Sequence, residues 1–165
     1  MSIYEGTTGI HSLNLLGRGV TANGGKAPQL LFAEVMKTVA EAKTHEVLLP
    51  YAEKLEKELG RLQKVTMHLL GLAAQGNNEV FLADATLYME LFGIITVAWQ
   101  WLKQGVVAQN AIEQQAPTGD ELTFYQDKIH TMKFYFHYEL IKTLSLAARL
   151  LDTEVLTVLQ EEVEA

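Results

Sequence analysis

The chain of 165 residues carries a formal net charge of −7, contains no cysteine, and is 48% hydrophobic and 20% charged. Its length suits one domain with a sizeable core. The lack of cysteine excludes disulfides, thiolate metal sites and a cysteine nucleophile, and agrees with a cytoplasmic location. The acidic balance argues against nucleic-acid binding, which depends on clustered lysine and arginine.

A short first helix is expected near the N-terminus. Thr7 or Thr8 can cap it, and Ile10, Leu13 and Leu16 would then fall roughly on one face.

A glycine-rich stretch follows this helix. Residues 17–28, GRGVTANGGKAP, have the composition of a linker. We therefore predict three units: an N-terminal arm of residues 1–18, a linker of residues 19–27, and a helical domain of residues 28–165.

Long helices are predicted beyond the linker because apolar residues recur at helical spacing and no strict two-residue alternation stands out. They run from about Pro28 to Thr44, from Pro50 through Leu72, from about Asn78 to Ala111, and from Gly119 through Ala147. The third is apolar on more than one side, which is typical of a central helix.

The chain is thus predicted to be all-α, an up-down antiparallel bundle of four long helices with a short N-terminal arm. A last short helix would begin at Asp152 or Thr153 and bury Leu156 and Leu159. Thr118 and Glu121 have the spacing of a capping box at the start of the fourth long helix.

The most apolar segment, residues 80–102, is predicted to be a buried helix and not a membrane span. It contains Asp84, Glu90 and Gln100, whereas a span needs about 20 residues with few or no charges.

The five histidines raise the possibility of a metal site. Di-iron bundles use Glu-x-x-His on two helices, and no glutamate here is followed by histidine three residues later. Glu41 with His45, and His130 with His137, could each share a helix face. Such pairs are common on surfaces, so no metal site is predicted, and a metal-binding bundle remains a minor alternative.

Two further features have both a structural and a functional interpretation. Phe92, Trp99 and Trp101 could stack on a flat ligand, but an aromatic run on a central helix is more often core. Lys128 borders an apolar stripe, either as a solvated side chain or as a buried, paired lysine that joins two helices.

The opening residues IYEGTTGIHSLNLLGRGV change the interpretation of Glu5, which alone would be an exposed carboxylate with no role. This stretch resembles the segment of acyl-CoA dehydrogenases that carries their catalytic base. Leu16-Gly17-Arg18 and Gly24-Gly25-Lys26-Ala27 resemble the subgroup with an extra C-terminal helical domain. Weaker similarity to that domain lies in residues 85–99 and 124–135.

The resemblance implies an oxidoreductase that converts an acyl-CoA thioester to a 2-enoyl-CoA. Glu5 would remove the α proton, Gly6 would leave space for the substrate, and Thr7 would lie near the cofactor. FAD would accept the β hydride, and an electron-transfer acceptor would reoxidise it.

The same resemblance implies that the chain is the last catalytic segment and added domain of a larger dehydrogenase. We expect the isolated chain neither to bind FAD stably nor to turn over acyl-CoA, and we expect it to form homo-oligomers. The alternative is a free-standing helical interaction module without catalytic activity.

Overall fold

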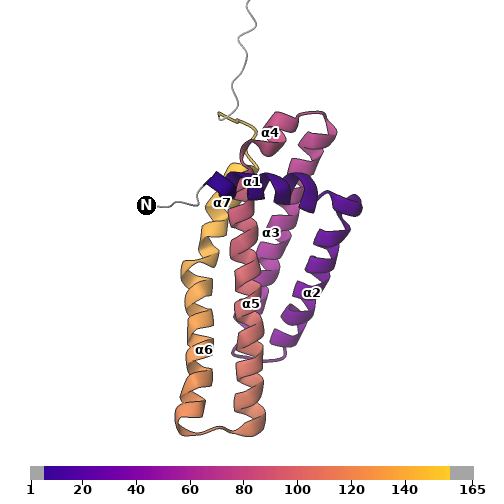
Figure 1. Ribbon diagram of the computed structural model, residues 1–165. Coiled ribbons are helices and arrows are strands. Elements are labelled where there is room, and N and C mark those ends of the chain that lie inside the picture. The colour runs from indigo at the N-terminus through magenta and orange to yellow at the C-terminus, as the bar shows by residue number, and fades with distance from the viewer. Residues whose placement is uncertain (1–5, 157–165) are drawn as a thin grey trace, which may run out of the picture.

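The computed structural model of the chain describes residues 6–156. Every regular element in that range is helical (Figure 1), which confirms the all-α prediction. The α-helices are α1 (Gly6–Asn14), α2 (Lys26–Ala42), α3 (Leu49–Ala74), α4 (Asn78–Ala83), α5 (Ala85–Gln115), α6 (Gly119–Tyr138) and α7 (Thr143–Leu150). Shorter turns are the π-helical η1 (Leu15–Gly19) and the 3₁₀ turns η2 (Ala22–Gly25) and η3 (Leu140–Lys142).

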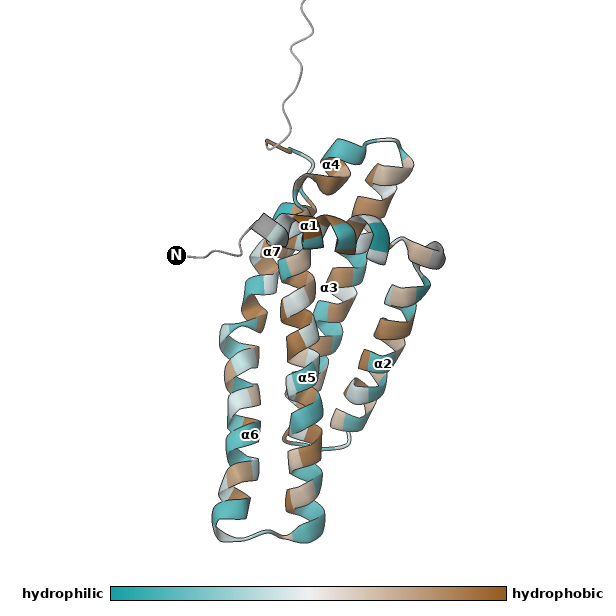
Figure 2. Ribbon diagram, in the orientation of Figure 1, coloured by the Kyte–Doolittle hydropathy of each residue, from teal (hydrophilic) through white to brown (hydrophobic). Residues whose placement is uncertain are grey.

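Helix α5 is central, as its apolar pattern predicted. It contacts α1, α2, α3, α6 and α7. In Figure 1, α2, α3, α5 and α6 stand side by side, and α1 lies across the end of the bundle where α7 is found. Figure 2 shows much apolar colour along α5, whereas α6 is mostly polar or neutral.

The predicted long helices α2 and α3 are confirmed. Pro50 lies in the first turn of α3, where its missing N–H costs no helical hydrogen bond. Helical spacing predicts an inward stripe on each helix, and it is buried at Val35, Val39, Leu55, Leu59, Leu62 and Leu69, whereas Leu31 and Leu72 are half-buried.

The prediction of one helix from Asn78 to Ala111 is wrong at Asp84. There the backbone leaves helical geometry, with φ −106° and ψ 28°, and α4 ends while α5 begins. The carboxylate of Asp84 accepts a hydrogen bond from Arg149 Nε at 3.3 Å. A short polar side chain that is bonded elsewhere is well suited to a helix boundary.

The helix predicted from Gly119 through Ala147 is also interrupted, at Glu139, so that η3 and α7 follow α6. Helical spacing places Leu144 on the buried stripe of the predicted helix, but this side chain is 41% exposed. The capping box does not form either. Thr118 occupies the N-cap of α6 in an extended conformation, but its side chain makes no capping hydrogen bond.

The short helix expected from Asp152 is not present in residues 152–156, and Leu156 is 85% exposed. Arg149 Nη2 donates to the carbonyl oxygen of Glu154 at 2.7 Å, and the N–H of Glu154 donates to Asp152 Oδ1 at 3.0 Å. These bonds between side chains and backbone hold a turn in place of a helix. Leu159 lies outside the described residues.

None of the described helices combines the length and hydropathy that a membrane span needs.

Candidate functional site

The predicted catalytic segment lies at the start of α1. Glu5 is outside the described residues, Gly6 is the first residue of α1, and the side chain of Thr7 is exposed. The chemical roles predicted for these three residues therefore stay predictions.

The arm that follows Glu5 is fixed to the bundle. Leu16 is fully buried and Val20 is 2% exposed. Ser12 is buried as well, and its Oγ lies 3.3 Å from Thr86 Oγ1 on α5. Ser12 also donates within α1, to the carbonyl oxygen of Thr8 or Gly9. The arm thus has both an apolar and a polar contact with the helices below it.

Of the three apolar residues expected roughly on one face of the first helix, only Leu16 is buried. Ile10 is 60% exposed and Leu13 is 45% exposed, while Leu16 is buried. The side of α1 that meets α5 carries Ser12, which is 1% exposed and lies four positions before Leu16. Residues four apart share a helix side, so Ser12 and Leu16 are buried together while Ile10 and Leu13 lie on other sides.

The histidines do not assemble a metal site within the described residues, where no group of at least three His, Asp and Glu side chains is suitably placed. His45 does not share a helix face with Glu41, because it lies in the turn after α2. Its Nδ1 instead lies 3.1 Å from Glu113 Oε2 on α5. The pKa of Glu113 lies below its usual 4.5. The largest cause is the hydrogen bond from Gln109, and the hydrogen bond with His45 lowers the pKa further.

The aromatic run of α5 is part of the core, as the sequence favoured. Trp99 Nε1 donates to Thr38 Oγ1 on α2 at 2.8 Å. Tyr88 is 1% exposed, and its hydroxyl lies 2.8 Å from Thr66 Oγ1 on α3. Burial raises the pKa of Tyr88 above 10.0, and its hydrogen bond with Thr66 opposes that change only in part.

Of the two interpretations of Lys128, the structure agrees with a side chain that reaches solvent and not with a buried, paired lysine. Lys128 is half-buried, and its Nζ lies 5.4 Å from the ring centroid of Phe124. With Lys103, Val107 and Tyr125 it lines an open, mainly apolar groove of about 370 Å³ between α5 and α6.

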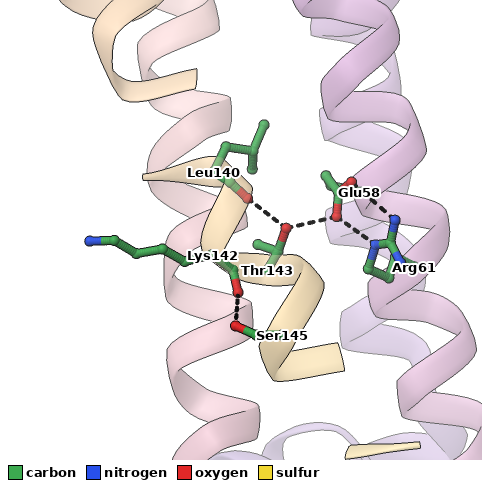
Figure 3. Close-up of polar contacts among 6 residues, drawn as sticks. All are labelled: Glu58, Arg61, Leu140, Lys142, Thr143 and Ser145. Atoms are coloured by element: carbon green, nitrogen blue, oxygen red, sulfur yellow. Dashed lines mark hydrogen bonds and ion pairs between the residues drawn. The ribbon is translucent and has the colours of Figure 1, made fainter. Parts of the chain in front are cut away.

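A polar cluster joins α3 to the start of α7 (Figure 3). Glu58 is 8% exposed, and its carboxylate accepts from Arg61 Nε at 2.8 Å and from Thr143 Oγ1 at 2.8 Å. The hydroxyl of Thr143 also lies 2.6 Å from the carbonyl oxygen of Leu140 in η3. Because a hydroxyl has one proton, Thr143 donates to only one of these acceptors at a time. The cluster lies where α6 gives way to α7, so it is positioned to hold that bend.

The comparison with known proteins decides the family. The sequence profile described as "Acetyl-CoA dehydrogenase C-terminal like" matches residues 31–158.

The chain belongs to this family.

Two curated relatives agree with the assignment. The 3-methylmercaptopropionyl-CoA dehydrogenase of Ruegeria pomeroyi is 27% identical over 154 residues, which are 93% of this chain and 25% of the relative. A broad-specificity linear acyl-CoA dehydrogenase of Mycobacterium tuberculosis is 28% identical over 140 residues, which are 81% of this chain and 23% of the relative. The chain spans about a quarter of the length of these relatives. The resemblance to acyl-CoA dehydrogenases is therefore confirmed.

The sequence did not predict the Glu58–Arg61–Thr143 cluster of this acyl-CoA dehydrogenase C-terminal segment. Arg61 follows Glu58 by three residues on α3, a spacing that a search for ion pairs could have found. Thr143 gives no such signal, because its contact with Glu58 spans 85 positions of the chain.

Proposed function

We propose that the chain supplies the C-terminal part of an FAD-dependent acyl-CoA dehydrogenase, including its catalytic base. The family match over residues 31–158 supports the C-terminal assignment, and the resemblance of the opening residues IYEGTTGIHSLNLLGRGV to the catalytic segment of acyl-CoA dehydrogenases supports that of the base. In this proposal residues 1–18 end the catalytic region, residues 19–27 connect it, and residues 28–165 form the added helical domain.

Glu5 is the proposed base for the α proton of the acyl-CoA thioester. A carboxylate performs this step when it is held against the proton in a dry pocket, which raises its pKa toward the working pH. Gly6 leaves room beside the substrate, and Thr7 lies near the cofactor. FAD held by the remainder of the assembled enzyme would supply the hydride-transfer chemistry at the β carbon.

The anchoring of the arm supports this role. A catalytic base must be positioned accurately, because small displacements cost large factors in rate. Burial of Leu16 and the Ser12–Thr86 contact tie the segment that follows Glu5 to α5. The helical domain can therefore act as the support of the catalytic segment.

The described residues do not by themselves fit FAD. The hollow beside the arm, lined by Leu15, Val20, Leu31 and Phe92, is apolar and has about 280 Å³. The nearby glycines of η1 and η2 follow a helix and do not follow a strand, unlike a phosphate-binding loop. We therefore assign the flavin pocket to the remainder of an assembled dehydrogenase.

A chimera tests the proposal. The chain would replace the matching C-terminal quarter of the Ruegeria pomeroyi relative, and acyl-CoA oxidation would be followed with an artificial electron acceptor. Glu5→Gln is expected to lower kcat by about 10²–10⁴, the usual contribution of a general base. Glu46→Gln, an exposed glutamate in the turn before α3, is the matched control and should leave kcat unchanged.

The result that contradicts the proposal is a flavin-loaded, active chimera in which Glu5→Gln has no effect. A stoichiometric flavin spectrum on the purified chain alone would contradict the assignment of the flavin pocket to the remainder.

The second candidate function is a helical interaction module without catalytic activity. Large exposed apolar side chains such as Phe134, Tyr138 and Ile141 favour it, because such groups mark contact surfaces. In that case the chimera would fold without dehydrogenase activity, whichever residue occupies position 5.

A further inference from the structure

One face of the bundle gathers aromatic rings and lysines where the start of α3 meets α6. We call Tyr51, Lys54, Lys133, Phe134 and Tyr138 the aromatic–lysine face. The rings of Phe134 and Tyr138 are stacked at 4.5 Å, and these side chains are 52% and 62% exposed. An open hollow of about 580 Å³ adjoins them.

The lysines of this face have rings and not carboxylates as neighbours. Lys54 Nζ lies 5.5 Å and Lys133 Nζ 6.0 Å from the ring centroid of Tyr51. Among the described residues, neither ammonium forms an ion pair. His130 and His137 line the same hollow. The two lysines therefore give the face positive charge that no carboxylate of the described residues pairs, on a chain whose net charge is −7.

The face continues along η3 toward α7 as an apolar strip. Ile141 is 56% exposed and Leu144 is 41% exposed. Both line a second hollow, of about 220 Å³, together with Lys54 and Lys57. Glu58 supplies the carboxylate that lines this second hollow, and it is already bound to Arg61 and Thr143. The surface therefore suits an occupant with apolar side chains and carboxylates.

The C-terminal segment of the chain has that composition. Residues 156–165 read LTVLQEEVEA, with Leu156, Leu159 and Val163 at helical spacing. Glu161, Glu162 and Glu164 form the most acidic run of the sequence. Leu156 is 85% exposed, so the apolar stripe begins with a side chain that the described residues leave uncovered.

We propose that residues 156–165 dock on the aromatic–lysine face of a second copy of the chain. Leu156, Leu159 and Val163 cover the exposed rings and apolar strip, and the glutamates pair with the lysines. Reciprocal exchange of the two segments closes a two-fold symmetric dimer, the commonest form of oligomer. The proposal does not rest on the proposed catalytic function.

Helix geometry favours a second copy over the chain's own face. Glu58 is level with Thr143 because their side chains are bonded. Tyr51 lies about 10 Å from the level of Glu58 along α3. Arg149 lies about 9 Å from the level of Thr143 along α7, in the opposite direction, and its side chain binds Glu154. If residues 157–165 take the helical form that the spacing of Leu156, Leu159 and Val163 indicates, they would span only about 13 Å. Such a helix would be too short to cover the roughly 20 Å between its start and Tyr51 of the same chain.

Charge reversal tests the proposal in the full chain. Sedimentation equilibrium at tens of micromolar is expected to show a dimer that weakens at high salt. Lys54→Glu/Lys133→Glu and Glu161→Lys/Glu162→Lys/Glu164→Lys should each weaken the dimer at least tenfold. An equimolar mixture of the two variants should restore it, because each segment then meets a face of opposite charge.

The matched control is Lys103→Glu/Lys128→Glu. These lysines also lie over aromatic rings and form no ion pair among the described residues, but they line the groove between α5 and α6. The control should dimerise as the unchanged chain does. If it abolishes the dimer while the face variant does not, the docking surface is that groove and the proposal is overturned.

Disulfide trapping gives a second readout that does not depend on charge. Because the chain has no cysteine, Val163→Cys and Tyr138→Cys each introduce a single thiol. Mixed under mild oxidation, they should form a disulfide between copies, whereas Val163→Cys mixed with Val107→Cys should not. A strictly monomeric chain, or variants that stay monomeric when mixed, would overturn the docking of a second copy.

Discussion

The hydroxyl of Thr143 lies 2.8 Å from the carboxylate of Glu58, although 85 positions separate the two residues in the chain. The contact ties the start of α7 to the middle of α3, at the level where α6 ends. Since Arg61 also donates to this carboxylate, the cluster gives a nearly buried charge both a cation and a hydroxyl donor. A buried carboxylate that keeps its partners stabilises the fold, whereas one that loses a partner destabilises it.

Thr143→Val is therefore expected to lower the free energy of unfolding by about 1–3 kcal/mol, because it leaves a buried acceptor without its donor. Thr143→Ser keeps the hydroxyl and should recover most of the loss. Urea unfolding followed by circular dichroism measures both. Thr131→Val, which removes an exposed hydroxyl bonded to the carbonyl oxygen of Asp127, is the control and should change stability little. If Thr143→Val and Thr131→Val lower the free energy of unfolding equally, the bond from Thr143 to Glu58 contributes no more than an exposed hydroxyl does.

Replacing each of two glycines of α5 by alanine should change the stability of the chain in opposite directions. A Cβ at Gly105 would lie 2.6 Å from Met132 Sδ in the core. Overpacking costs about 1–3 kcal/mol, which exceeds the roughly 0.5–1 kcal/mol that alanine gains within a helix. Gly105→Ala should therefore destabilise the chain. Gly93→Ala meets nothing within 4 Å and should stabilise it by about 0.5–1 kcal/mol. Thermal unfolding of both variants checks the difference in sign.

The stability contributed by Glu113 should depend on pH. Hydrogen bonds from Gln109 and His45 lower its folded-state pKa below 4.5, so its contribution is present above that pH and is lost as the pH falls through the lower folded value. Compared with the unchanged chain, Glu113→Gln should thus be less stable near pH 7, and the two should converge in acid. Urea midpoints across this range measure the difference. A gap that stays constant down to the lowest pH would rule out this ionisation as its source.

The attachment of the N-terminal arm to the bundle should depend on the side chain of Leu16 and not on that of Leu13. Leu16→Ala removes a fully buried side chain, a change that typically costs about 2–5 kcal/mol. Amide hydrogen exchange in α1 should then become faster, because the arm has lost its main apolar anchor. Leu13→Ala, at a side chain that is 45% exposed, should leave exchange nearly unchanged. If exchange in α1 does not respond to Leu16→Ala, the arm is held by other contacts.

Much of the fold could be predicted from local pattern. The start of α3 at Pro50, the buried stripes of α2 and α3, and the central place of α5 follow from helical spacing and proline geometry. The proposed catalytic segment rests only on its resemblance to a family, since a lone carboxylate near a chain end carries no physical signal.

The two errors in the long helices coincide with side-chain contacts between distant residues. The helix predicted across Asp84 breaks where Asp84 meets Arg149, 65 positions away. The helix predicted to Ala147 bends at Glu139, just before Thr143 meets Glu58. Local spacing contains no information about such partners, so it predicts uninterrupted helices at both places.

The sequence by itself determined that the chain is helical, which faces of most helices are apolar, and which family the chain belongs to, because periodicity and motifs are local properties of the residues. Only the tertiary structure decided where the helices break, how the arm lies on α5, and which polar side chains meet in the interior. Those outcomes depend on contacts between helices, and a polar side chain is stable inside the bundle only where packing brings it a partner.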